Sequence, residues 1–112
     1  MTILQVAERL QAHILVQGEG MERPVGHVVA SDLMSDVLLV DEEDILLLTS
    51  LASDQVLRTA QIVGAVGVIV VNGKPLPSSM AQVANELHMT LATSDLSKYE
   101  ACVTLYEALK TP

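Results

Sequence analysis

A unit made of an apolar run, a polar turn and a helix-like stretch recurs three times in the second half of this 112-residue chain. Short continuous apolar runs that alternate with helical patterns are typical of buried parallel strands in an α/β sheet. The runs cover residues 45–48, 68–71 and 89–92, and they end in Thr49-Ser50, Asn72-Gly73-Lys74 and Thr93-Ser94-Asp95. The pattern predicts a three-layer α/β/α sandwich on a mostly parallel sheet of about five strands, to which residues 13–30 contribute one or two outer strands.

The length of the chain predicts one domain over residues 1–112. The sequence has two Tyr and no Trp or Phe, so the core must be built from Val, Leu, Ile, Ala and Met. Ser78 or Ser79 is expected to cap the helix that follows the second repeat, and Ser97 with Glu100 forms a capping box for the last helix. That last helix is expected to bury its apolar positions, which are Tyr99, Cys102, Val103, Tyr106 and Leu109.

The formal net charge of −8, from 14 acidic and 6 basic side chains, argues against two classes of partner. Nucleic acids and anionic membrane surfaces both attract clusters of Lys and Arg. Because the six basic residues of this chain are scattered along the sequence, neither nucleic acid nor a membrane is an expected partner.

The sequence predicts neither membrane insertion nor secretion. The longest apolar stretch, residues 65–71, is far shorter than the roughly 18–20 residues that span a bilayer. Residues 1–5 lack the basic flank and the long apolar core of a signal peptide. The single cysteine, Cys102, fits a reducing compartment, so a cytoplasmic location is expected.

The three polar turns should lie along the carboxyl edge of the sheet, where open α/β folds bind their ligands. Gly73 permits a positive φ and a close approach of a ligand to the backbone, and Lys74 could add a positive charge. Ser78 or Ser79 opens a helix whose free N–H groups favour an anion. The alternative is a rigid connection that binds nothing. Neither nucleotide-binding glycine motif is present.

Small hydroxyl and carboxyl side chains flank this loop if the three strands are neighbours. They could bind oxygen atoms of a ligand, or they could equally satisfy backbone groups of the turns. The candidate ligand-binding residues are Thr49, Ser50, Asn72, Gly73, Lys74, Ser78, Thr93 and Asp95.

No catalytic residue, metal ligand or cofactor is predicted. The three histidines lack metal-site spacing, and no nucleophile stands beside an evident base. Asp32 and Asp36 are four residues apart and could form a metal or acid–base pair on one helix face. Helix capping by Asp32 and a solvated Asp36 is the favoured interpretation.

The order of these segments resembles the DRTGG domain family, which is itself similar to the N-terminal domain of HPr kinase/phosphorylase. The resemblance covers nearly the whole chain. The Asp-Arg of the family falls near Leu51-Ala52, and its Thr-Gly-Gly falls on Asn72-Gly73-Lys74, where only the central Gly is kept. The matching segments are residues 25–36, Leu46-Leu47-Leu48-Thr49, Asp54, residues 68–73, Pro77-Ser78, Leu91-Ala92-Thr93-Ser94-Asp95 and Tyr99.

The resemblance implies a stand-alone, non-catalytic regulatory or assembly domain that self-associates. A homodimer is expected, also because the apolar-rich segment 25–40 is hard to bury within one domain. A small anionic metabolite or nucleotide is the candidate ligand, and a protein partner is a further candidate. The alternatives are a small enzyme or phosphocarrier that uses Thr49, Lys74 and Asp95, or a pure protein-interaction subunit without a ligand.

Overall fold

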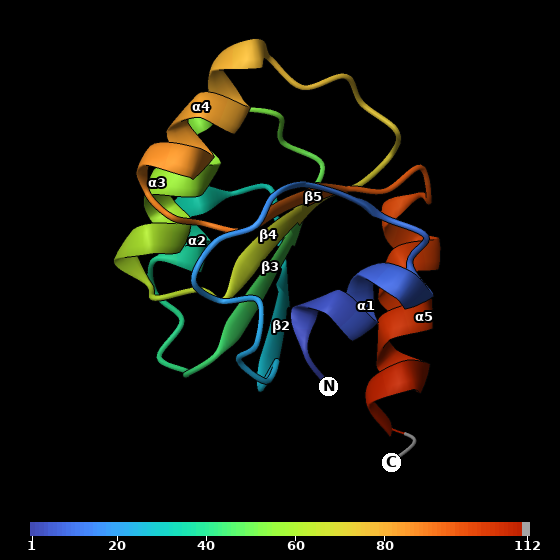
Figure 1. Cartoon of the computed structure of the whole chain (residues 1–112). Helices are drawn as coiled ribbons and strands as arrows, with labels where there is room; N and C mark the ends of the chain where they lie inside the picture. Colours follow the sequence, from blue (N-terminus) through green and yellow to red (C-terminus); the bar gives the residue numbers. More distant parts are fainter. Residues whose placement is uncertain (111–112) are drawn as a thin grey trace.

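A single five-stranded sheet lies at the centre of the computed structural model, which describes residues 1–110 (Figure 1). The elements within this range are α1 (Ile3–Arg9), β1 (His13–Val16), β2 (His27–Ala30), α2 (Met34–Val37), β3 (Ile45–Thr49), α3 (Asp54–Ile62), β4 (Gly67–Val70), α4 (Ser78–Glu86), β5 (Leu91–Thr93) and α5 (Lys98–Lys110). No helix of this part of the chain is long and apolar enough to cross a membrane.

The strands lie in the order β1-β5-β4-β3-β2. The four strands from β2 to β5 are parallel, and β1 pairs with β5 in the antiparallel direction. The predicted α/β sandwich with a mostly parallel sheet is therefore confirmed. Segment 13–30 supplies both outer strands, β1 at one edge and β2 at the other.

Helices cover both faces of the sheet. Figure 1 shows α2, α3 and α4 on one face and α1 and α5 on the other. Alternate residues of β3 divide between the two cores, since Ile45 and Leu47 face one cluster and Leu46 and Leu48 the other. All four side chains are fully buried, as the continuous apolar run of a central parallel strand predicts.

Side chains cap the starts of α1 and α5, but the caps predicted for α2 and α4 are absent. Thr2 with Gln5, and Ser97 with Glu100, form capping boxes at the starts of α1 and α5. Neither Ser78 nor Ser79 caps α4, because the helix begins one residue after Pro77 and no side chain accepts from its first amides. Asp32 does not cap α2 either, because its carboxylate is directed to β3.

The buried face of α5 also differs from the prediction. Ala101, Leu105 and Ala108 face the sheet, whereas Tyr99 is 77% exposed and Tyr106 is 67% exposed. Val103 and Leu109 are exposed too, and Cys102 is half-buried. The helix carries two overlapping apolar stripes at the same spacing, and the stripe with two alanines lets the helix approach the sheet more closely. The stripe with the large side chains therefore faces the solvent.

Candidate ligand site at the carboxyl edge

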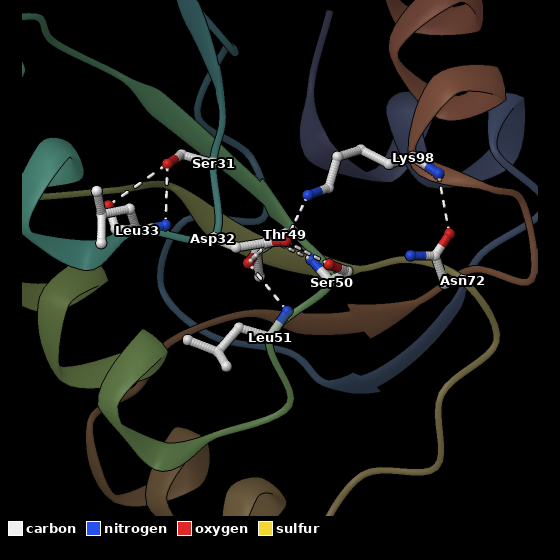
Figure 2. Close-up of polar contacts among 8 residues, drawn as sticks. All are labelled: Ser31, Asp32, Leu33, Thr49, Ser50, Leu51, Asn72 and Lys98. Atoms are coloured by element: carbon white, nitrogen blue, oxygen red, sulfur yellow. Dashed lines mark hydrogen bonds and ion pairs between the residues drawn. The ribbon is translucent and has the colours of Figure 1, made fainter.

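The connections that follow β2, β3, β4 and β5 meet at one edge of the sheet, because parallel strands all end on the same side. Figure 2 shows Asp32 from the β2–α2 connection beside Thr49 and Ser50 at the end of β3. Asn72, which follows β4, lies beside Lys98 at the start of α5. The fold thus brings polar residues from four separate segments together.

The carboxylate of Asp32 is the centre of this edge. Its Oδ1 accepts hydrogen bonds from Thr49 Oγ1 at 2.8 Å and from the Ser50 amide at 2.7 Å. Its Oδ2 accepts from Ser50 Oγ and from Lys98 Nζ, each at 2.5 Å (Figure 2). Asp32 therefore ties the β2–α2 connection to β3 and to the first turn of α5.

These contacts keep Asp32 ionised. Partial burial alone would raise the pKa of its carboxyl group. The hydrogen bonds from Lys98, Ser50 and Thr49 outweigh that effect and hold the pKa well below its usual range. At neutral pH the side chain is thus a fixed negative charge.

Thr49 and Ser50, two of the predicted ligand residues, are buried, and their hydroxyl groups are used on Asp32. Sequence reasoning assigned Asp32 to a helix cap and did not select Lys98. Asp32 follows β2 as Thr49-Ser50 follows β3, so applying the carboxyl-edge argument to the first parallel strand would have found it. No comparable signal marks Lys98, which lies 66 positions from Asp32.

The Asn72–Gly73 turn is held against the segment that follows β5. Asn72 and Gly73 both have positive φ, at 70° and 61°. Their amides donate to Leu96 O at 2.8 Å and to Ser94 O at 3.0 Å. Asn72 Oδ1 accepts from the Lys98 amide at 3.0 Å. A Cβ on Gly73 would lie 3.2 Å from Asp95 Oδ1, so Asp95 stands directly over this glycine.

The remaining predicted residues are less connected. Lys74 and Ser78 are exposed, and within residues 1–110 neither side chain has a hydrogen bond or an ion pair. Thr93 is half-buried at the end of β5, where it pairs in register with Val70. The structure thus joins Thr49 with Ser50, and Gly73 with Asp95, but gives no contact that joins Lys74 and Ser78 to them.

Among the described residues, no group of three or more His, Cys, Asp or Glu side chains could hold a metal ion. A groove of about 390 Å³ opens elsewhere, between β2 and α5, and none of the eight predicted site residues lines it. Its lining residues are Gly26, His27, Val28, Cys102, Leu105, Tyr106, Leu109 and Lys110.

Neither a family model nor a curated protein matches this sequence. Among solved structures, the chain is similar to the crystal structure of the CBS and DRTGG domains of the regulatory region of Clostridium perfringens pyrophosphatase, complexed with the activator diadenosine tetraphosphate. The TM-score is 0.75 at 15% sequence identity, and the match covers 93% of this chain but 45% of that chain. This chain therefore spans less than half of its structural neighbour, and the likeness shows that it has a DRTGG-like fold.

Proposed function

We propose that this chain is a non-catalytic regulatory or assembly domain that self-associates and senses a small anionic ligand at its 72–78 loop. The observation that carries the proposal is a set of large exposed side chains on α5 and at the two ends of α2, here called the apolar surface. They include both aromatic residues of the chain. They are Leu33, Leu38, Leu39, Tyr99, Val103, Tyr106 and Leu109. Such a surface favours protein–protein contact.

The 72–78 loop supports the ligand part of the proposal. Lys74 offers an exposed positive charge, and no side chain caps the start of α4. The amides of an uncapped helix start favour an anion. The structural neighbour is a regulatory region complexed with an anionic dinucleotide activator, which makes nucleotides the first class to test.

A chain of hydrogen bonds leads from this loop to the apolar surface. Asn72 accepts from the Lys98 amide, and the Lys98 ammonium group pairs with Asp32. Asp32 lies between β2 and α2, and Lys98 begins α5. A ligand that moves Asn72 would thus act on the elements that carry the exposed apolar residues.

The chemistry of the edge favours a non-catalytic role over a small enzyme or phosphocarrier. The hydroxyl groups of Thr49 and Ser50 both donate to Asp32, so Asp32 is the base that would have to activate either of them as a nucleophile. The lowered pKa of Asp32 makes its carboxylate a weak proton acceptor at neutral pH. A cytoplasmic location is part of the proposal and is supported by the single cysteine.

A protein-interaction subunit without a ligand is the second candidate. It is favoured by the extent to which the polar groups of the edge already bind one another. Asp32, Asn72 and Ser94 are all engaged in contacts within the chain.

A thermal-shift screen against nucleotides, including diadenosine tetraphosphate, and phosphorylated metabolites separates the two candidates. A ligand at 100 times its dissociation constant adds about 2.7 kcal/mol to the stability of the folded state. We expect at least one anion to raise the melting temperature of the wild-type chain, and Lys74→Ala to reduce that rise. The variant itself should lose less than about 0.5 kcal/mol of stability, because Lys74 is exposed. If every anion leaves the melting temperature unchanged, ligand sensing is wrong and the interaction subunit remains.

A further inference from the structure

We propose that β2 pairs with β2 of a second copy of this chain, so that two five-stranded sheets join into one continuous sheet. The inference rests on the proposed self-association and specifies its surface and its symmetry. The other edge strand, β1, has an irregular register between Ile14 and Val16, whereas the pairing of β2 with β3 is regular throughout. An irregular register is one way in which edge strands avoid further pairing, and β2 lacks it.

The backbone of β2 leaves two residues available for a partner. The amides of His27 and Ser31 donate to β3 and the residues beside it, at Asp44 O and Leu48 O. Because hydrogen-bonding direction alternates along a strand, the N–H and C=O groups of Val28 and Ala30 point away from β3. A two-fold axis at Val29 would let Val28 of one copy exchange both bonds with Ala30 of the other. The same segment is thus complementary to itself in the antiparallel direction.

The side chains on both faces of β2 fit this arrangement. Val28 packs on the side of α5, where the small Ala30 of the other copy would lie directly opposite. Val29 packs on the side of α2 and would meet Val29 of the other copy at the axis. Pairs of β-branched side chains across antiparallel strands stabilise a sheet.

The exposed stripe of α5 lies beside this edge. At 3.6 residues per turn, Tyr99, Cys102, Val103, Tyr106 and Leu109 fall on one side of the helix. Cys102, Tyr106 and Leu109 also line the groove that α5 forms with β2. Two-fold pairing of β2 would bring this stripe against its own copy, running in the opposite direction. Tyr is enriched at protein interfaces, and both tyrosines of the chain lie on the stripe.

The exposed tyrosines can supply a substantial part of the area that a stable dimer buries. An aromatic side chain buries roughly 150–250 Å² when it is fully covered. Tyr99 and Tyr106, at 77% and 67% exposed, would therefore contribute roughly 200–350 Å² in each copy. A standard interface buries about 800 Å² on each partner. The exposed leucines at the two ends of α2, the groove side chains and the strand itself are the further groups that pairing would cover.

The charge of the groove is compatible with a second copy of this acidic chain. Two molecules with a net charge of −8 repel each other least where the surfaces that meet carry few acids. None of the residues that line the groove is acidic, and they include the basic residue Lys110. This part of the surface is thus one at which two acidic copies can approach.

Matched variants at the two edges test the pairing. Ala30→Lys places a charge on β2, and Leu15→Lys places the same charge at an exposed position of β1. We expect light scattering at micromolar concentration to give about 24 kDa, twice the 12.0 kDa of one chain, for the wild type and Leu15→Lys, and 12 kDa for Ala30→Lys. Circular dichroism verifies that both variants fold.

A second pair of variants tests the stripe of α5. Tyr106→Ser should raise the dimer dissociation constant roughly tenfold or more, and Ile62→Ser, on an exposed position of α3, should not.

Hydrogen exchange of the wild-type chain gives an independent test. The amides of Val28 and Ala30 should be protected at concentrations that hold the dimer, and should lose that protection on dilution. If a dimer persists in Ala30→Lys, or if these two amides exchange fast within it, pairing through β2 is wrong although self-association stands. If the wild-type chain is a monomer at every concentration tested, both proposals fail and the edge is open to a different chain.

Discussion

At the scale of single residues, Asp32 is the side chain on which the carboxyl edge depends most. Its pKa in the folded chain lies below the ordinary value of 3.8, so its contacts stabilise the folded state fully when the pH is above that value. The contribution decreases as the pH falls below about 4, and it is lost once the pH falls through the lower pKa of the folded chain and the carboxylate there takes up a proton. The contacts of ionised Asp32 therefore contribute to the stability of the folded chain near neutral pH but not in strong acid.

Replacement of Asp32 by Asn should lower the free energy of unfolding at pH 7 by about 1–2 kcal/mol, since charge-assisted hydrogen bonds are lost from a partly exposed group that solvent screens. The difference from the wild type should shrink as the pH is lowered below about 4. Urea unfolding at several pH values measures both effects. Asp36→Asn, at an exposed position of α2, is the control. A difference that is the same at every pH would show that ionisation of Asp32 does not contribute.

Gly73 is the second residue with a specific conformational role. Its φ of 61° is unfavourable for a β-branched side chain, and a Cβ would also crowd Asp95. Gly73→Val should cost about 1–3 kcal/mol of stability. Gly64→Val is a matched control, because Gly64 has φ 69° and no atom within 4 Å of an added Cβ. We expect Gly73→Val to be the more destabilising of the two by thermal unfolding. A Gly73→Val variant as stable as the parent would mean that the turn does not need this geometry.

At the scale of elements, α5 shows where sequence periodicity is insufficient. Its apolar positions cover a wider arc than the sheet can bury, and the stripe of Ala101, Leu105 and Ala108 competes with the stripe of larger residues. Burial of the larger stripe would hide more apolar area, but the alanines permit closer packing on the sheet. Spacing alone does not distinguish these outcomes, because both stripes repeat every three or four residues.

This orientation of α5 predicts unequal effects of two leucines. Leu105→Ala should lower the free energy of unfolding by about 2–4 kcal/mol, because the side chain is fully buried and its removal leaves a cavity. Leu109→Ala should cost less than half as much, since Leu109 is 40% exposed. Urea unfolding at the lowest workable protein concentration, where association contributes least, measures both. Equal losses would indicate that α5 is rotated from the orientation described.

At the scale of the whole molecule, the sequence indicates the layers of helices and sheet better than the order of the strands within the sheet. The fully apolar runs of β3 and β4 predict strands that are buried on both faces, and both are. The order of the strands and the meeting of Asp32 with Lys98 could not be predicted in this way. They depend on which elements become neighbours in space. The local pattern of apolar and polar residues does not indicate which segments 66 positions apart come into contact.

In the proposed dimer, a second copy covers the edge strand β2 and the exposed stripe of α5. A domain of this kind would regulate by changing its association, with the carboxyl edge as the place where a ligand acts on α5 and β2. Self-association is therefore the central claim, and it holds or fails independently of the identity of any ligand.

The most direct test is the mass of the wild-type chain in solution, measured by light scattering over a range of micromolar concentrations. One chain has a mass of 12.0 kDa. We predict a mass of about 24 kDa that falls toward that of one chain on dilution. A mass of 12 kDa at every concentration would contradict the claim.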